Sequence, residues 1–370
     1  MGILMWLSSF NTVNRNLQLA WLISLCFTTT TCQFAHAAES RIPVKVIIAA
    51  MFEIGETTDD EPGELQFWVE RLNLNTKLPF TLGERDIYMN EDGVMAVLLG
   101  GGISNATASV MALGADPRFD LTKAYWLIAG VAGGDPADIS LGSAAWAKFV
   151  VDGDLAYEID AREMPEHWPY GMVPLGSTEP ADKPEDIYTV WTLDTIVFEL
   201  NETLVDWAYT LTQDVDLGDA DGIADYRRLF SGYKNAQRSP FVTVGDTLSS
   251  STYWHGRNLN LWANDWIRAY AGHNANFMTS NMEDSGTMTA IRRLARLDIV
   301  DADRVLILRT ASNYTMPPPG KDPHWSLTTP YPDNLRPALE AAFTVGNVIV
   351  QALLDDWDKH KDLIPSIASQ

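Results

Sequence analysis

The chain has 370 residues and a formal net charge of −23, from 49 acidic and 26 basic residues. A strongly negative surface repels phosphate groups, so this charge argues against binding to nucleic acid or anionic lipid and favours a neutral small molecule. The length suffices for one large α/β core or two smaller ones.

Residues 1–37 are interpreted as a secretory signal peptide. Arg15 precedes an apolar run over 17–27, and the small-residue pattern 35–37 stands before Ala38. Both cysteines lie inside this segment, so the remaining chain has no thiol, and its histidines lack metal-ligand spacing. We therefore expect no metal and no cofactor. Because no later apolar run approaches about 18 residues, we expect a periplasmic or secreted protein without a membrane span.

The first strand of the exported chain is predicted over 41–50, where apolar residues continue without alternation, as in buried parallel strands. It leads into Met51-Phe52-Glu53. A carboxylate at the end of a leading strand can act as a general base or bind sugar hydroxyls, which makes Glu53 a candidate catalytic residue. The alternative is a loop acid on an acidic protein. An amphipathic helix is predicted over 63–72.

The stretch 94–136 is predicted to form one βαβ unit. Apolar strands over 94–99 and 124–129 flank a helix that ends near residue 113, and each strand leads into glycines. Glycines at the carboxyl edge of a parallel sheet let backbone N–H groups approach a ligand closely. This unit is therefore the expected centre of a small-molecule site.

The glycine-rich turn also has three other interpretations. Gly100-x-Gly102-x-x-Asn105 half-fits a dinucleotide fingerprint but lacks the third glycine and the acidic residue after the next strand. The segment 102–106 half-fits a nucleophile elbow with Ser104 as an esterase nucleophile and His324 as its partner. In the third, Ser104 only caps the helix.

In the middle of the chain we expect two strands over 141–161 joined at Gly153, a long loop over 164–186 and a helix over 192–213. The segment 214–225 carries five aspartates. Alternating oxygen ligands with a glycine turn are typical of calcium loops, but the terminal glutamate is missing, and a solvated connecting loop is the alternative.

In the last third of the chain, a strand is predicted over 240–245. Residues with hydroxyl side chains follow it, and then Tyr253 and Trp254. These aromatic rings could stack on a flat heterocycle, or they form the margin of a core. Glu283 is expected at the start of a helix, where the helix dipole stabilises its charge. A strand over 304–309 and a closing helix over 337–361 complete the chain.

Several strand ends, taken in order, resemble the nucleoside phosphorylase and nucleosidase superfamily. The matching segments are 99–106, 129–134, Val244-Gly245-Asp246-Thr247, Met282-Glu283 and Arg309-Thr310-Ala311-Ser312-Asn313. Asp116-Pro-Arg-Phe-Asp120 and Tyr253-Trp-His-Gly256 make the closest likeness the purine nucleoside permease family. The resemblance implies one α/β domain over 38–370, with a central mixed β-sheet flanked by helices.

The resemblance also implies roles for particular residues. Glu283 would bind the ribose diol, Met282 would pack on the sugar, and Asn313 would hydrogen bond to the purine edge. Backbone N–H groups near Gly101 and Gly102, and near Val131 and Gly133, would face phosphate or water. Asp246 and Trp254 complete the expected substrate-binding set.

The implied function is an exported purine nucleoside-binding protein that serves nucleoside uptake and cleaves the N-ribosyl bond, with phosphate or water as co-substrate. Some members of the family carry a serine where this chain has Val131 and an aspartate where it has Asn313. Because this chain lacks that hydroxyl and that carboxyl group, a second interpretation is a non-catalytic binding protein. Because a chain without a membrane span cannot form a translocation path, uptake implies an inner-membrane carrier as partner. A homo-oligomer is also expected.

Overall fold

The computed structural model describes residues 41–187 and 194–367, and residues 40–370 form one compact unit. The predicted signal peptide and the start of the helix predicted over 192–213 lie outside the described residues.

The core of the fold is a mixed sheet of twelve strands in the described part of the chain. These are β2 (Val46–Ala50), β3 (Thr76–Leu78), β4 (Ile87–Met89), β5 (Val94–Leu98), β7 (Tyr125–Gly134), β8 (Ala144–Trp146), β9 (Phe149–Asp152), β12 (Val197–Glu199), β13 (Val242–Val244), β14 (Asp246–Ser249), β15 (Phe277–Asn281) and β16 (Val305–Tyr314). Two small sheets pair β1 (Ile42–Pro43) with β6 (Phe119–Asp120) and β10 (Ala156–Glu158) with β11 (Met172–Pro174).

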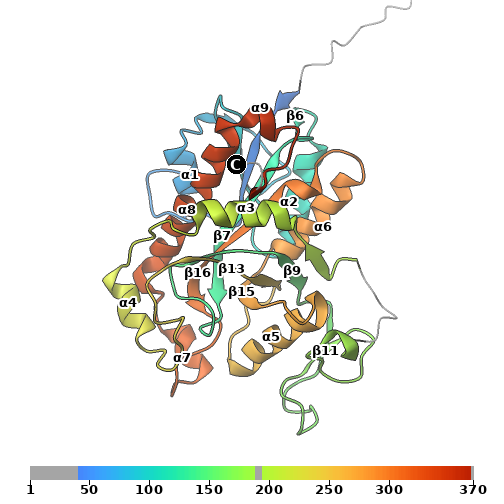
Figure 1. Ribbon diagram of the computed structural model, residues 1–370, viewed down its shortest axis with the longest axis vertical. Helices are drawn as coiled ribbons and strands as arrows, with labels where there is room; N and C mark the ends of the chain where they lie inside the picture. Colours follow the sequence, from blue (N-terminus) through green and yellow to red (C-terminus); the bar gives the residue numbers. More distant parts are fainter. Residues whose placement is uncertain (1–40, 188–193, 368–370) are drawn as a thin grey trace, which may run out of the picture. The chain divides into compact units, whose positions relative to one another are not determined.

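Helices pack on this sheet and on one another (Figure 1). They are α1 (Gln66–Arg71), α2 (Ile103–Ala115), α3 (Glu202–Thr212), α4 (Asp221–Arg227), α5 (Arg257–Ala271), α6 (Asp284–Ala295), α7 (Pro323–Thr328), α8 (Arg336–Asp355) and α9 (Trp357–His360), with short 3₁₀ turns at η1 (Pro184–Asp186), η3 (Ala302–Arg304) and η4 (Pro332–Leu335). Helix α8 packs on β7 and β16 and against α1 and α3, while α2 and α6 pack together.

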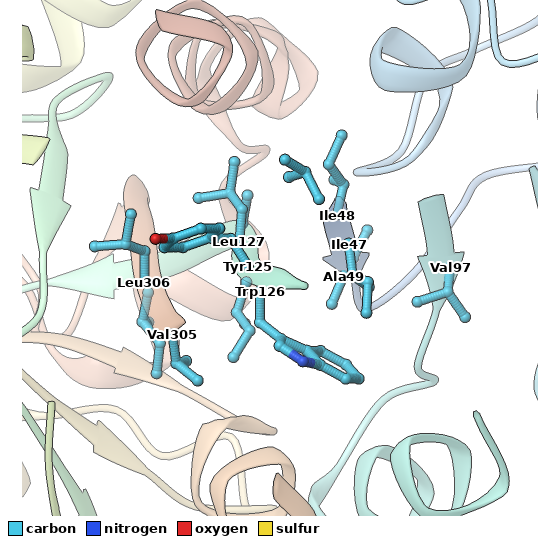
Figure 2. Close-up of a cluster of buried hydrophobic side chains, with 14 of the residues drawn as sticks. Ile47, Ile48, Ala49, Val97, Tyr125, Trp126, Leu127, Val305 and Leu306 are labelled. Carbon is cyan, nitrogen blue, oxygen red and sulfur yellow. The ribbon is translucent and has the colours of Figure 1, made fainter. Parts of the chain in front are cut away.

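Long apolar strands form the centre of the core. Strand β2 is buried at all five positions, and β7 pairs in parallel with β2 on one edge and with β16 on the other. Figure 2 shows the alternation along β7, where Leu127 and Trp126 point to opposite sides of the sheet. Because both faces are covered, the strands read as continuous apolar runs.

Strand β7 changes partner along one edge. It pairs with β2 from Tyr125 to Ile128 and with the antiparallel β15 at Gly133 and Gly134, while β16 occupies the other edge throughout. Between the pairings with β2 and β15, this edge of β7 has no neighbouring strand around Val131 in the described part of the chain. This gap in the sheet is the place where α/β folds bind ligands, beyond the carboxyl ends of parallel strands.

Helix α8 is the one helix in the described part of the chain that is long and apolar enough to cross a membrane. Half of its most apolar window is buried in the protein. A core helix passes the same test of length and composition, and α8 lies against the central strands.

The structure confirms the mixed α/β sheet with flanking helices and the βαβ unit, and it divides the predicted leading strand into β1 and β2 and the predicted closing helix into α8 and α9. It corrects the end of the second βαβ strand, because β7 continues through Gly130, Gly133 and Gly134 rather than ending before them. The register with β16 extends to these glycines, so they belong to the ladder.

Other predictions in the middle of the chain are wrong. Strands β9 and β10 do not form a hairpin at Gly153, since β9 pairs with β12 and β14 while β10 pairs with β11. The segment predicted as the first half of a helix contains β12, and α3 begins only after Asn201, whose side chain caps it. The long helix α5 lies in a stretch for which no element was predicted.

We expect Gly346→Ala in α8 to lower the free energy of unfolding by about 1–2 kcal/mol, because overpacking outweighs the gain in helix propensity. A methyl group on Gly346 would lie 2.7 Å from Cη2 of the buried Trp68 and 3.1 Å from Cδ2 of Leu127. Urea unfolding measures the change. Gln351→Ala, at an exposed position of the same helix, is the control; an unfolding midpoint for Gly346→Ala at or above the wild-type value would contradict this packing.

Candidate functional site

A cavity of about 210 Å³ lies at the gap in the sheet. Its walls come from the segment after β2, the glycine-rich end of β7, the end of β15 with the start of α6, the end of β16, and two tyrosines from loops. The lining residues are Met51, Phe52, Glu64, Val131, Ala132, Gly133, Tyr253, Ser280, Asn281, Met282, Glu283, Ser312, Asn313, Tyr331 and Leu335.

Glu64 lies at the gap in the sheet, where its carboxylate bridges the backbone just after β2 and the backbone of β7. One carboxylate oxygen accepts a hydrogen bond from the Met51 N–H at 2.8 Å and the other accepts one from the Val131 N–H at 2.6 Å. Burial raises the pKa of Glu64 to about 7; the Arg309 charge opposes this rise and the Glu283 charge adds to it. Glu64 therefore exchanges a proton near neutral pH, as a general acid or base must.

Arg309, on β16, is the buried cation behind the cavity. Its guanidinium donates to both Asp284 oxygens, at 2.5 and 3.1 Å, and to the Val131 carbonyl at 3.2 Å, and it lies 3.5 Å from Glu283 Oε2. Three carboxylates thus face one guanidinium, because Glu64 also feels its charge. The Arg309 charge lowers the pKa of Glu64 more than the Glu283 charge raises it, so burial is what keeps Glu64 protonated at higher pH than an ordinary carboxyl group.

Glu283 stands at the N-cap position of α6, as expected from the sequence. It is 7% exposed, and its carboxylate accepts hydrogen bonds from the backbone N–H of Gly102 at 3.3 Å and of Met282 at 3.2 Å. Burial raises its pKa, while Arg309 opposes that rise. The glycine turn before α2 and the start of α6 are thereby joined at one carboxylate.

A β-bulge brings two successive side chains of β16 to the cavity. The register with β7 shifts between Ala311 and Asn313, so both Ser312 and Asn313 line the cavity although neighbours on a regular strand face opposite sides. The Asn313 amide donates to the Tyr253 hydroxyl at 2.9 Å, and Tyr253 and Tyr331 hydroxyls are 3.1 Å apart. This gives a polar edge with an amide that both donates and accepts.

The structure brings Val131, Gly133, Met282, Glu283 and Asn313 to this cavity. The Gly102 N–H reaches it through Glu283. Gly101 is exposed at the same turn and does not line the cavity.

Three other predicted site residues do not line the cavity. The Glu53 carboxylate accepts the backbone N–H groups of Gly63, Leu65 and Gln66, so it holds the start of α1. Asp246 lies at the opposite end of β14 and accepts the N–H groups of Phe149 and Asn276. Trp254 packs against Trp262 and Phe277, away from the cavity.

Sequence reasoning missed Glu64, Ser312 and the contact of Tyr253 with Asn313. For Glu64 the sequence offered one signal, an acidic residue directly before the mainly apolar run over 65–69.

The esterase and calcium interpretations gain no support. Ser104 is exposed in the first turn of α2, where Gly102 rather than Ser104 is the N-cap, and no hydrogen bond joins it to His324 in the described chain. Among the aspartates of 214–225, Asp219 pairs with the buried Arg227 at 2.6 Å and Asp225 pairs with Arg228. These carboxylates are ion-paired within the protein rather than arranged around a cation position.

The chain matches known sequences over most of its length. Residues 43–365 match the model of the family Purine nucleoside permease (NUP). A purine nucleoside permease of Candida albicans is 32% identical over 270 residues, 72% of this chain and 65% of that protein. A probable purine nucleoside permease of Schizosaccharomyces pombe is 35% identical over 222 residues, 58% of this chain and 62% of that protein. The matches thus span slightly less than two thirds of these curated relatives.

Among solved structures, futalosine hydrolase of Helicobacter pylori is 14% identical, with 84% of this chain and 98% of that chain covered and a TM-score of 0.50. The fold is therefore that of the nucleoside phosphorylase-like α/β proteins. Within that class, the chain belongs to the purine nucleoside permease family.

The raised pKa of Glu64 predicts a pH-dependent contribution to stability. The folded protein retains this proton up to about pH 7, whereas the unfolded chain releases it near pH 4.5. The folded state therefore binds more protons in this window, and the free energy of unfolding falls as pH rises. Relative to Glu64→Gln, the wild-type protein should lose about 3 kcal/mol between these pH values.

Urea unfolding of the wild-type protein and of Glu64→Gln at several pH values measures the difference between their free energies of unfolding. The other titratable groups are the same in both proteins, so their contributions cancel in this difference. Glu163→Gln, at an exposed position, is the matched control. A constant difference between wild type and Glu64→Gln from pH 4.5 to 7 would show that Glu64 is not held protonated.

Proposed function

We propose that the protein binds purine nucleosides in this cavity and cleaves their N-ribosyl bond with water as the nucleophile. The observation that carries the proposal is Glu64, a buried cavity carboxyl group whose pKa of about 7 suits proton transfer. The family membership supports the nucleoside as ligand, and the cavity supplies the groups that such a ligand needs.

In this proposal each part of the nucleoside meets a different group. The Glu283 carboxylate accepts hydrogen bonds from the ribose hydroxyls, and Met282 packs on the sugar. Asn313 hydrogen bonds to the purine edge, while Phe52 and Tyr253 contact the ring faces. All five residues line the cavity.

The proposed reaction is balanced as a hydrolysis. The water oxygen bonds to C1′ as the bond from C1′ to the purine nitrogen breaks, and that bond's electron pair leaves with the purine. Glu64 accepts a proton from the attacking water and afterwards releases it to solvent, while the departing purine takes up one proton from solvent and leaves as the free base, so that one water molecule is consumed in all. Asn313 stabilises the leaving purine by hydrogen bonding, because an amide cannot give up a proton.

Water is favoured over phosphate because the cavity offers no free cation. No lysine or arginine lines it among the described residues, and the nearby Arg309 is engaged by Asp284, Glu283 and the Val131 carbonyl. A phosphate dianion would instead face the carboxyl groups of Glu64 and Glu283. Repulsion between like charges in a buried site opposes such binding.

The first test incubates the purified protein with inosine and adenosine, with and without phosphate, and measures free base. We expect base release that does not require phosphate. Glu64→Gln should reduce the rate about 100-fold or more while inosine still binds, since general base catalysis contributes at least that much. Release only with phosphate would contradict the choice of water, and an unchanged rate in Glu64→Gln would contradict the role of Glu64.

A second candidate function is nucleoside binding without cleavage, in the service of uptake. Val131 provides no hydroxyl group and Asn313 no transferable proton, and both line the cavity. In this alternative the protein is exported, to the periplasm or out of the cell, and delivers purine nucleosides to an inner-membrane carrier. A homo-oligomer would fit the same role. Saturable inosine binding without any release of base supports this alternative.

We expect Glu283→Ala to weaken inosine binding by about 1.5–3 kcal/mol, the usual value of a hydrogen bond to a charged group. Calorimetric titration with inosine and with 2′,3′-dideoxyinosine isolates the contact. Wild type should bind inosine more tightly than the dideoxy compound, and Glu283→Ala should bind both alike. If the variant still prefers inosine by the wild-type factor, Glu283 does not bind the ribose diol.

A further inference from the structure

A second pocket, of about 270 Å³, shares a wall with the nucleoside cavity. The shared wall is the loop segment 250–254. Its side chains divide between the two sides, since Tyr253 lines the nucleoside cavity whereas Ser250, Thr252 and Trp254 line the second pocket. The pocket is bounded on its other sides by α5 and by the strands β10 and β11.

The second pocket combines aromatic walls with an acidic rim. Trp254 and Trp262 are 8% and 2% exposed, with ring centroids 5.5 Å apart at an interplanar angle of 75°, and the indole N–H of each has no hydrogen-bond partner among the described residues. Met172 and Leu259 add apolar surface, and the carboxylates of Asp154 and Glu158 stand at the exposed side. No lysine, arginine or histidine lines this pocket in the described chain.

We propose that this pocket is a second ligand site, for an organic amine with an aromatic or apolar body. The body packs against the apolar wall to which Trp254, Met172 and Leu259 contribute. The ammonium group pairs with Glu158 and Asp154.

A chain of short contacts connects the second pocket to the nucleoside cavity. Asp154 Oδ2 accepts the Ser251 N–H at 3.0 Å, and Ser251 Oγ accepts the Ile103 N–H at 3.1 Å. The adjacent Gly102 N–H donates to Glu283 at 3.3 Å. An ammonium group on Asp154 competes with Ser251 for that carboxylate, so amine binding alters the turn that holds Glu283. The two ligands are therefore expected to change each other's affinity.

The first experiment titrates the whole protein with tyramine in a calorimeter, and with 4-hydroxyphenylacetate as the anionic compound of similar shape. We expect saturable binding of tyramine and none of the anion. Glu158→Gln should weaken tyramine binding about two- to fivefold, the range for a partly exposed ion pair. Glu163→Gln, an exposed carboxylate that does not line the pocket, should leave it unchanged.

Three results would overturn the amine site. They are no saturable binding of tyramine, equal binding of the anion, and equal affinity in wild type and Glu158→Gln. Because Glu158 is exposed, the variant is expected to fold, and its thermal unfolding curve verifies this.

The second experiment measures inosine affinity at saturating tyramine, and tyramine affinity at saturating inosine. Linkage requires the two affinities to change by the same factor. This experiment rests on the proposed nucleoside function, whereas the tyramine titration does not. Inosine that binds without changing tyramine affinity would overturn the connection between the pockets, while absence of inosine binding counts against the proposed function alone.

Discussion

The buried guanidinium of Arg309 is the interaction on which the candidate site depends. Removing such a cation from water is costly unless its donors are satisfied. Here Asp284 takes two of its hydrogen bonds, the Val131 carbonyl takes a third, and Glu283 lies beside it. These partners come from α6 and β7 while Arg309 comes from β16, so one charge cluster holds three elements in position. The same charge opposes the rise in pKa that burial causes at Glu64 and Glu283.

The glycines of β7 make this cluster sterically possible. A Cβ atom on Gly130 would lie 2.6 Å from Glu64 Oε1 and 2.7 Å from Arg309 Nη1. A side chain there would therefore separate the carboxyl group from the guanidinium. At Gly133, an added Cβ would lie 3.2 Å from the Asn313 amide nitrogen, so glycine also allows the purine-facing amide to approach the strand. The glycine run thus serves close packing of polar side chains against a central strand.

Binding and chemistry depend on different groups in this arrangement. Glu283, Met282 and Asn313 surround a ligand whether or not it reacts, whereas Glu64 adds the capacity to exchange a proton near neutral pH. The cavity has carboxyl groups and no free cation, in agreement with the negative charge of the whole chain. A neutral nucleoside and a neutral water molecule suit this electrostatic environment better than an anionic co-substrate.

The sequence by itself determined the α/β class, the leading strand, the βαβ unit and the positions of Glu283 and Asn313 at the ends of elements, because apolar periodicity and helix-start signals are local. It could not choose between Glu53 and Glu64, since both follow β2 and only the folding back of the chain decides which carboxyl group enters the gap in the sheet. Nor could it choose Tyr253 over Trp254 or place Ser312 beside Asn313. Side chains on extended segments alternate with a period of two, and a single bulge or an offset of one residue reverses the face that each presents. The raised pKa of Glu64 likewise depends on Arg309 and Glu283, which are remote in sequence and meet it only in the tertiary structure.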